Sequence, residues 1–515
     1  MIKIKHLEDE NFIHVDSDDF NDILFIDDKF KFRVPQFQFM RAYKTGQWDG
    51  YIRLFDKGRR KLYKGLFIKL LVILEANELE YIVDDKLVDD FEQLEPEEVL
   101  GYLKNEIKLN WSMVPRKYQL QSILQCLTNL RRIILSPTSS GKSLILYGIV
   151  NYYLYNELLE NDEKILLLVP NIGLVDQMRG DFLTYEKVGG ARNIDSHIHT
   201  IYGGKEKDDP KSKLIISTWQ SIYKLPKSYF EKFKLVLVDE IHLAEANSIK
   251  SIMEKCVNAN LRYGFSGTLK KSKCSELALN AYFGDVYRAV EYQELMEKNY
   301  ISGLEITNVV LNYKKLPEVY EPAYIEEKDY FNEKKIVLGS EKRSKFIADM
   351  AMRLKGNTLI LFEYISLGEK INAYLKDMNT ENNKNNKNNK KQLLFIDGSV
   401  SANRRNEIRS IMEENDDCIL CASYGTTSTG VNIKNISNVI FGSPYKSPIK
   451  VLQSIGRGLR KHKNKVKLRL FDIVDDLRPG RRKNERRNHF YKHWEERKEL
   501  YFSHNFEQKT KKLYL

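Results

Sequence analysis

Short, uninterrupted apolar runs recur along most of this chain, and stretches long enough to form a helix separate them. A strand that is buried on both faces lacks the polar–apolar alternation of a half-exposed strand, so such runs indicate the interior of a parallel sheet. Helical crossovers between parallel strands account for the spacing. The runs form two groups, with Ile133–Leu135, Ile165–Val169, Leu214–Ile216 and Leu235–Val238 in the first and Thr358–Phe362, Leu393–Ile396, Cys418–Cys421 and Asn438–Phe441 in the second. The sequence therefore predicts an α/β protein with two successive parallel-sheet units.

The regions around these two units complete the expected domain organisation. A chain of 515 residues has room for about three domains at roughly 150 residues each. Residues 1–108 alternate strand-like runs with turns, which predicts a small α+β accessory domain. We expect the sheet units at 109–302 and 303–480, followed by a basic C-terminal tail at 481–515. The Asn- and Lys-rich segment 381–391 has low complexity, so we expect a disordered surface insertion there.

Basic residues are clustered rather than spread evenly. The net charge is +12, and the segment from Lys29 to Lys69 holds twelve Lys or Arg against two acids. The segment from Lys446 to Leu515 holds twenty-one against eight. A surface that only confers solubility would intersperse the two signs. Clustered basic charge favours a polyanionic partner, because each neutralised phosphate releases counterions.

Membrane insertion and secretion are not expected. The longest apolar stretch, Gly65 to Leu74, contains Lys69 and is about half the ~20 residues that a spanning helix needs. The N-terminus has no apolar signal region, so we expect a cytoplasmic protein. Five cysteines are few and odd in number, which is typical of a reducing compartment. Cys418 and Cys421 form a C-x-x-C pair within an expected buried strand, which favours packing over zinc binding.

A phosphate-binding loop is indicated between the first apolar run and the helix that follows it. The segment Ser136-Pro-Thr-Ser-Ser-Gly-Lys-Ser143 has the strand–loop–helix context of a P-loop, although Ser136 stands where the general motif has glycine. Backbone N–H groups and the helix N-terminus would face the phosphates. Lys142 would contact the β- and γ-phosphates of ATP, and Ser143 would help to hold Mg²⁺. The remaining expected nucleotide contacts in the loop are Pro137, Thr138, Ser139, Ser140 and Gly141.

Two carboxylates follow the apolar run Leu235–Val238 about a hundred residues after the loop. They could be acids solvated at a strand end, but the upstream P-loop favours the Walker B arrangement. Asp239 would then bind Mg²⁺, and Glu240 would orient and polarise the attacking water.

The box Asp239-Glu-Ile-His242 resembles that of the superfamily 2 helicases, in which ATP binds between two RecA-like lobes. Ser266-Gly-Thr268 is similar to the motif that links hydrolysis to lobe movement in that family. Arg457 and Arg460 lie three residues apart, so we expect both on one face of a helix, where arginine fingers could offset charge on the γ-phosphate. The resemblance implies adenine contacts by Arg116 and Gln119, nucleotide contacts by Gly430 and Asn432, nucleic-acid contacts by Pro170 and Thr218, and catalytic roles for His242, Gln453, Arg457 and Arg460.

The N-terminal segment Tyr43–Phe55, which contains Trp48, resembles the accessory domain of the UvsW family of phage recombination and repair helicases. This resemblance implies an ATP-dependent DNA helicase that remodels forks, Holliday junctions, R-loops and D-loops with 3′-to-5′ polarity in an infected bacterial cell. Single-strand-binding or recombination proteins and RNA–DNA hybrids are possible partners. Trp48 itself could equally anchor a small core. The expected phosphate contacts are the basic residues of this region, Arg53, Lys57, Arg59, Arg60, Lys61 and Lys64.

Two alternatives remain open. An RNA helicase would share the ATP site, although the accessory segment and the motif that begins at Gln453 disfavour it. A clamp that binds nucleic acid under ATP control without translocating is a different class of protein, which the complete set of hydrolytic groups disfavours.

Overall fold

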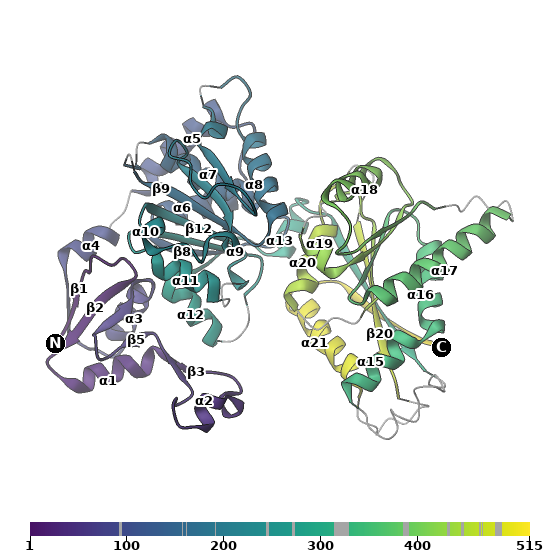
Figure 1. Cartoon of the computed structure of the whole chain (residues 1–515), viewed down its shortest axis with the longest axis horizontal. Coiled ribbons are helices and arrows are strands. Elements are labelled where there is room, and N and C mark those ends of the chain that lie inside the picture. Colours follow the sequence, from purple (N-terminus) through teal and green to yellow (C-terminus); the bar gives the residue numbers. More distant parts are fainter. Residues whose placement is uncertain are drawn as a thin grey trace. The chain divides into compact units, whose positions relative to one another are not determined.

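The structure is a computed structural model of the whole chain, and it describes residues 1–515 except 92–94, 157, 161, 191, 244–246, 270–272, 314–328, 385–390, 430–432, 444–447, 463–464, 466 and 479–486. The chain divides into two compact units, Met1–Val290 and Glu291–Leu515 (Figure 1). Each unit contains a seven-stranded parallel sheet, and the first also carries a smaller N-terminal sheet. The expected fold class is therefore confirmed. Within the described residues, no helix is long and apolar enough to cross a membrane.

The N-terminal accessory domain is built on a five-stranded sheet in the order β5-β6-β2-β1-β7. Strands β1 and β7 run parallel and the other neighbours antiparallel. Burial alternates along β2, so that Ile13 and Val15 enter the core while their neighbours do not. The elements are β1 (Ile2–Lys5), β2 (Phe12–Ser17), α1 (Phe20–Lys29), β5 (Phe55–Asp56), β6 (Lys61–Tyr63), η2 (Lys64–Leu66), α3 (Phe67–Ala76), β7 (Tyr81–Val83) and α4 (Asp85–Phe91).

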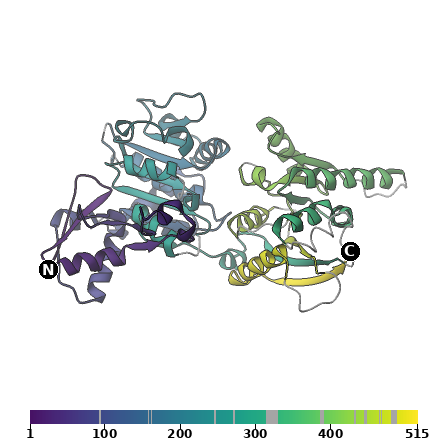
Figure 2. The same ribbon diagram turned by 60° about the horizontal axis from the view of Figure 1, so that its bottom comes forward.

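A short arm leaves this domain between α1 and β5. Its base is a two-stranded antiparallel ribbon in which Lys31 pairs with Arg53. Trp48 is half-buried and its indole N–H donates to the Tyr51 carbonyl oxygen at 2.7 Å, so it helps to hold the arm together. Figure 1 and Figure 2 show the arm extending away from the five-stranded sheet. The elements are β3 (Lys31–Arg33), η1 (Phe37–Phe39), α2 (Arg41–Lys44) and β4 (Tyr51–Arg53).

Buried polar contacts join the accessory domain to the first sheet unit. Lys64 is 1% exposed and forms an ion pair with Glu10, whose carbonyl oxygen accepts a hydrogen bond from Arg131. Gly65 has no room for a side chain, because an added Cβ would lie 2.7 Å from the carbonyl oxygen of Ala281. Ala281 in turn belongs to the core of the accessory domain. These contacts explain why accessory domain and first lobe form one unit.

The first lobe has a parallel sheet in the order β10-β11-β9-β12-β13-β8-β14. Every apolar run predicted for this region is a strand of it. The central strands β9, β11 and β13 are buried at every position, which is the physical reason that their sequences do not alternate. The strands are β8 (Arg131–Leu135), β9 (Lys164–Val169), β10 (Ile198–Ile201), β11 (Leu214–Thr218), β12 (Phe233–Asp239), β13 (Leu261–Ser266) and β14 (Val286–Arg288). The helices are α5 (Pro96–Asn110), α6 (Lys117–Leu127), α7 (Lys142–Tyr155), α8 (Ile172–Tyr185), η3 (Ile194–His197), α9 (Trp219–Ile222), α10 (Lys227–Phe230), η4 (Ile241–Leu243), α11 (Asn247–Lys255) and α12 (Lys273–Phe283).

The second lobe repeats this plan in the order β17-β18-β16-β19-β20-β15-β21, again with parallel neighbours. Cys418 and Cys421 are buried at β18, as expected. The strands are β15 (Gly303–Asn312), β16 (Thr358–Phe362), β17 (Leu393–Ile396), β18 (Ile419–Ser423), β19 (Asn438–Phe441), β20 (Lys467–Asp476) and β21 (Gln508–Tyr514). The helices are α13 (Tyr292–Glu297), α15 (Tyr330–Gly339), α16 (Glu341–Arg353), α17 (Ile365–Lys384), α18 (Ala402–Glu414), α19 (Tyr424–Thr429), α20 (Pro448–Gly458) and α21 (His489–Ser503). Most of the insertion expected at 381–391 lies outside the described residues.

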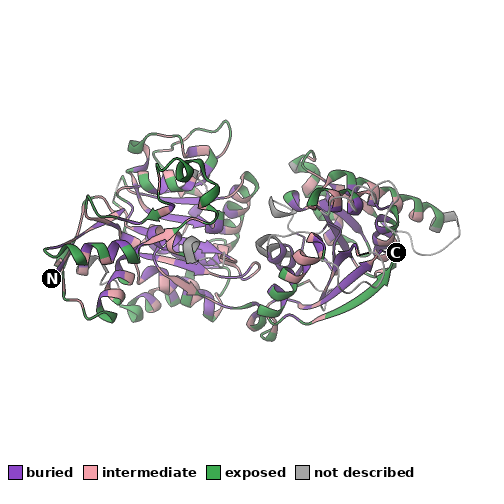
Figure 3. Ribbon diagram, turned by 90° about the horizontal axis from the view of Figure 1, so that it is seen from below, coloured by how far each residue is buried: buried purple, intermediate pink, exposed green. Residues whose placement is uncertain are grey.

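The end of the chain differs from the basic tail that the sequence suggested. Helix α21 buries Trp494 and Arg497, and β21 pairs with β15 along the edge of the second sheet. Figure 3 shows the strands of this sheet mostly buried and β21 mostly exposed. An exposed edge strand can carry many lysines, and such charge protects it from pairing with other chains. The lysine-rich sequence of β21 was therefore assigned to a basic tail rather than to a strand of the second sheet.

Candidate functional site

The candidate site of the first lobe lies where strands β8, β13 and β12 end side by side. Because the strands are parallel and adjacent, the loops that follow them leave the same edge of the sheet. The Ser136 N–H donates to the Ser266 carbonyl oxygen at 2.9 Å, which links the loop after β8 to the end of β13. The sheet therefore brings together the P-loop, the Asp-Glu-Ile-His box and Ser266-Gly-Thr268, which are far apart in sequence.

The loop Ser136–Ser143 has the backbone geometry of an anion-binding concavity. Ser139 and Gly141 adopt left-handed conformations, with φ of 72° and 82°. Alternation of right- and left-handed residues turns successive N–H groups toward one point. The Ser136 and Ser140 hydroxyls are 2.6 Å apart, so a side-chain hydrogen bond braces the loop at the position where the general motif has glycine. Gly141 directly precedes α7, whose N-terminus adds its dipole.

Lys142 contacts both carboxylates at the end of β12. Its Nζ is 2.8 Å from Glu240 Oε1 and 3.8 Å from Asp239 Oδ1. Burial raises the pKa of Asp239 to about 6, against the attraction of Lys142. Burial also disfavours the charged form of Glu240, but Lys142 and His242 outweigh it and hold the pKa of Glu240 below its usual range. Glu240 also has a left-handed backbone, with φ of 57°, a conformation that costs a non-glycine residue about 1–3 kcal/mol and is common at functional sites.

Ser143 has a partner that the sequence did not suggest. Its Oγ lies 2.7 Å from the hydroxyl of Tyr185, the last residue of α8. Carboxylate and hydroxyl oxygens are suitable ligands for Mg²⁺. Asp239 provides such oxygens at the end of β12, and Ser143 provides one in the first turn of α7. Their chemistry therefore fits a magnesium ion. Tyr185 had no motif that could identify it, because its contact with Ser143 depends on how α8 packs.

His242 connects the carboxylate box to the end of β13. Its Nδ1 is 3.2 Å from Glu240 Oε2 and 3.0 Å from Ser266 Oγ. Ser266 donates its single hydroxyl proton to the Thr268 carbonyl oxygen at 2.7 Å, so the Nδ1 of His242 is the donor in their shared hydrogen bond. One imidazole nitrogen therefore lies close to both Glu240 and Ser266.

Gln119 contacts the P-loop rather than leaving its amide free. Its Nε2 donates to the Ser140 carbonyl oxygen at 2.9 Å, and its Oε1 accepts from the Arg116 backbone N–H at 2.8 Å. The Tyr118 hydroxyl donates to the same Ser140 carbonyl oxygen at 2.5 Å. The side-chain amide has two N–H groups and two acceptor lone pairs, so these bonds do not by themselves exclude the expected adenine contact of Gln119. In this structure, Gln119 and Tyr118 support the loop.

The expected site residues of the second lobe are only partly described. Gly430 and Asn432 lie outside the described residues, as do the side chains of Gln453 and Arg457 within α20. Helix α20 ends at Gly458, so Arg460 lies beyond it rather than on the same helical face as Arg457. This part of the expectation is wrong, because the turn before β20 begins two residues earlier than the spacing suggested.

The expected nucleic-acid contacts of the accessory domain fall into distinct groups. Lys57 and Arg59 are exposed in the hairpin loop between β5 and β6, whose Asp56 side chain accepts from the Arg59 N–H at 3.0 Å. Lys61 follows at the start of β6 and is half-buried. Arg60 forms an ion pair with Asp16, with 3.2 Å between Nε and Oδ1. Arg53 forms ion pairs with Asp49, at 2.5 Å between Nη2 and Oδ2, and with Asp27, at 3.4 Å between Nε and Oδ1. Lys64 cannot contact a phosphate, because it is buried against Glu10; that expectation was wrong.

Pro170 and Thr218 follow or end neighbouring strands at the carboxyl edge of the first sheet, where Val169 pairs with Thr218. Pro170 is half-buried. Thr218 is buried, and its hydroxyl lies 2.8 Å from that of Ser221. The structure therefore brings the two segments together, but the Thr218 side chain is not displayed to solvent.

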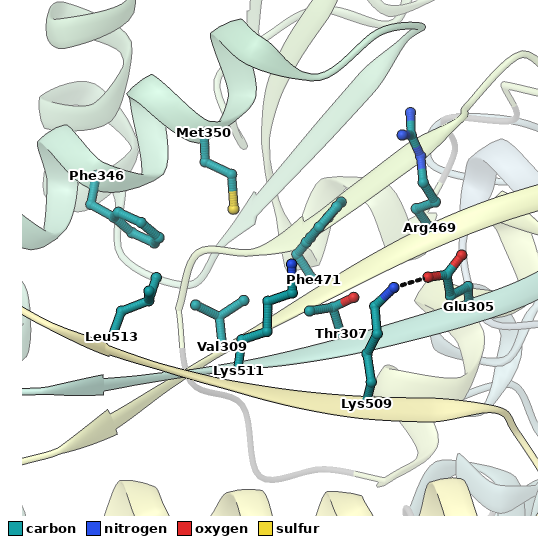
Figure 4. A pocket seen from close by; sticks show the side chains of 10 residues that line it. All are labelled: Glu305, Thr307, Val309, Phe346, Met350, Arg469, Phe471, Lys509, Lys511 and Leu513. Carbon is teal, nitrogen blue, oxygen red and sulfur yellow. Dashed lines mark hydrogen bonds and ion pairs between the residues drawn. The ribbon is translucent and has the colours of Figure 1, made fainter.

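A basic hollow of about 440 Å³ lies on the second lobe and contains no residue of any motif. Figure 4 shows Lys509, Lys511 and Arg469 around it. Hydrogen bonds from Lys509 and from Lys467 lower the pKa of Glu305 to about 2, so two of the nearby cations already share a counter-ion. Basic residues near the C-terminus are therefore partly neutralised within the lobe.

Comparisons with known proteins agree with this architecture. The family model "Type III restriction enzyme, res subunit" matches residues 112–271, and "Helicase conserved C-terminal domain" matches residues 342–462. The ATP-dependent DNA helicase uvsW of Enterobacteria phage T4 is 32% identical over 480 residues, 91% of this chain and 90% of that protein. The DNA 3′-5′ translocase XPB2 of Sulfurisphaera tokodaii is 23% identical over 74% of this chain and 86% of its own length. The crystal structure of T4 UvsW superposes with a TM-score of 0.50 at 29% identity, covering 100% of this chain and 99% of that one.

Proposed function

Because this chain belongs to the superfamily 2 helicases, in the same family as the phage helicase UvsW, we propose that its ATP-dependent activity remodels branched DNA with 3′-to-5′ polarity. The observation that carries the catalytic part is the contact of Lys142 with Glu240 and Asp239 beneath the P-loop. Forks, Holliday junctions, R-loops and D-loops are the proposed substrates. The name of the archaeal 3′-5′ translocase supports the polarity.

We assign the groups of the first lobe as follows. The γ-phosphate of ATP replaces Glu240 as the partner of Lys142, and the released carboxylate orients the attacking water and accepts its proton. Before ATP binds, Lys142 and His242 lower the pKa of Glu240 and hold it in the ionised form. Mg²⁺, when held by Ser143 and Asp239, would offset the charge of the β- and γ-phosphates. His242, which lies close to both residues, would couple the movement of Glu240 to Ser266.

The second lobe would complete the site by supplying positive charge. Arg457 and Arg460 are the proposed arginine fingers, with Gln453, Gly430 and Asn432 as further nucleotide-site residues. A phosphoryl-transfer transition state places additional charge on the γ-phosphate oxygens, which guanidinium groups stabilise. If these arginines engage only when the lobes close, hydrolysis and lobe movement are coupled.

The basic surface of the accessory domain supports DNA as the substrate. Lys57 and Arg59 protrude from one hairpin, and phosphate contacts of this kind position a protein without reading sequence. The proposed setting is the cytoplasm of a phage-infected bacterium, with single-strand-binding or recombination proteins as candidate partners and RNA–DNA hybrids as part of R-loop substrates.

The decisive experiment measures ATPase rates with forked DNA, linear duplex, single-stranded DNA and RNA as activators. We expect the highest kcat/KM for forked DNA and loss of turnover by about 10²- to 10⁴-fold in Glu240→Gln, with ATP binding retained. Partial duplexes with a single 3′ or 5′ tail test the polarity, and unwinding is expected with the 3′ tail. Strongest activation by RNA would favour an RNA helicase. DNA-stimulated hydrolysis without strand displacement or branch movement would favour the clamp.

A further inference from the structure

The arm of the accessory domain has its own internal contacts and an apolar end. Phe37 packs on the inner face of the arm. Its ring centroid lies 4.6 Å from that of Tyr43 in an edge-on arrangement, and the Arg33 guanidinium lies 4.6 Å from the same Phe37 centroid. Gly50 is required beside Phe37, because its φ is 85° and an added Cβ would lie 2.7 Å from the ring. With the Trp48 hydrogen bond, these contacts fix the backbone that carries the arm's outer residues.

The outer residues of this arm are unusually apolar for a protruding loop. Phe39 is 70% exposed, Met40 42% and Tyr43 37%. Phe37, two residues before Phe39, is half-buried, so the arm already has its core without Phe39. Contiguous exposed aromatic and aliphatic groups on a segment that projects from its domain are typical of a binding surface. We call Phe39, Met40 and Tyr43 the arm tip.

The charge around the arm tip identifies the chemistry of its partner. Between Lys31 and Arg53 the chain has five basic residues and one acid, Asp49. That acid is already engaged by Arg53 at 2.5 Å. Arg41 and Lys44 flank the tip and are exposed, and in the described part of the chain neither forms an ion pair with an acid. An apolar tip set in uncompensated positive charge complements a ligand with flat apolar faces and a polyanionic backbone.

We propose that the arm tip is a stacking site for unpaired bases at a DNA branch, with Arg41 and Lys44 holding the phosphates on either side. The proposal rests on the proposed DNA-remodelling function and specifies which part of a branched substrate the accessory domain recognises. In continuous duplex the base faces are covered by their neighbours, so a phenylalanine ring can stack only where pairing ends. Each base–aromatic stack contributes about 1–3 kcal/mol and depends little on sequence.

The test compares binding of the full-length protein to a fork with single-stranded arms and to a blunt duplex of the same paired length. Phe39→Ala is expected to weaken fork binding about 5- to 150-fold, which is the fold-change that corresponds to one lost stack. Blunt-duplex affinity should stay within about twofold. Phe502→Ala is the matched control, because Phe502 is 77% exposed but lies on α21 in the second lobe. Phe39→Trp should retain fork binding and show quenching of the added indole fluorescence by the fork but not by the duplex.

The phosphate part of the proposal has its own measurement. Arg41→Gln combined with Lys44→Gln should flatten the log–log salt dependence of fork binding by about 0.7–0.9 for each lost contact, whereas Phe39→Ala should leave the slope unchanged. Unchanged fork affinity in Phe39→Ala overturns the proposal, as does an equal loss on fork and duplex. A change of sedimentation with unchanged DNA binding would instead assign the tip to self-association. If the wild-type protein binds forks no better than duplex, the proposed function fails, and this is seen before any variant is compared.

Discussion

Replacing Arg497 should selectively destabilise the second lobe, although the sequence places this residue in a basic tail. Arg497 and Asp472 are both buried, at 1% and 0% of side-chain exposure, and their two bonds measure 2.8 and 2.9 Å. The Tyr501 hydroxyl donates to the same carboxylate at 2.9 Å. Burial disfavours the charged guanidinium, but Asp472 outweighs this and raises the pKa of Arg497. Arg497→Met would leave the Asp472 carboxylate buried without its counter-charge.

The expected cost follows from that uncompensated charge. Removing one partner of a buried ion pair destabilises a protein by about 3–5 kcal/mol. At about 1.36 kcal/mol per factor of ten, this corresponds to an increase of about 160- to 5,000-fold in the opening equilibrium of the lobe. The double variant Arg497→Met with Asp472→Leu should recover most of the loss, because well-packed apolar residues can replace a buried pair.

Native-state hydrogen exchange of the full-length protein, followed peptide by peptide, measures this loss where it occurs. Peptides of β20, β15 and α21 should lose protection by the stated factor, while peptides of the first lobe act as an internal reference. Lys498→Met is the control, because Lys498 is the exposed neighbour of Arg497. The prediction would be refuted if Arg497→Met, like the control variant, lowered the hydrogen-exchange protection of β20 by less than about threefold.

Three further predictions concern other parts of the chain. Gly65→Ala should destabilise the junction between the accessory domain and the first lobe by about 1–3 kcal/mol, because the new Cβ would collide with the carbonyl oxygens of Asn280 and Ala281. A thermal unfolding curve like that of the wild type would contradict this. Arg457→Ala should keep nucleotide affinity and lose about 10³-fold or more in turnover at saturation; loss of affinity with normal turnover would exclude the finger role. Tyr185→Phe should leave folding intact and change the Mg²⁺ concentration at half-maximal nucleotide binding, since Ser143 loses a hydroxyl partner at 2.7 Å. An unchanged Mg²⁺ dependence of nucleotide binding would show that this contact is incidental.

Local sequence was informative wherever the environment of a segment is uniform. Central strands such as Leu235–Val238 are enclosed on both faces by covering helices, so their composition alone reveals them. The P-loop was recognisable because phosphate binding requires a short loop that ends at Gly141, with Lys142 and Ser143 in the first turn of the helix that follows. Asp239 and Glu240 could be predicted as a Walker B pair from their position at the end of an apolar strand.

Features that depend on distant partners were missed or misjudged. Lys64 lies in a basic segment, which favoured a phosphate contact, but it is buried against Glu10. Tyr185 contacts Ser143 from the end of another helix. Arg460 falls beyond α20 because the chain turns there toward β20, which spacing alone could not reveal.

The sequence by itself determined the two parallel-sheet lobes and their order, and it predicted the residues of the first nucleotide site, because each of these leaves a periodic or contiguous pattern in neighbouring residues. Only the tertiary structure decided which charges are available to a ligand and which are used internally. Arg497 and Lys64 are both basic residues in basic segments, yet each is buried with a carboxylate from elsewhere in the chain. The physical reason is that the cost of burying a charge is set by the groups around it in space, and these come from parts of the chain that a local pattern cannot identify.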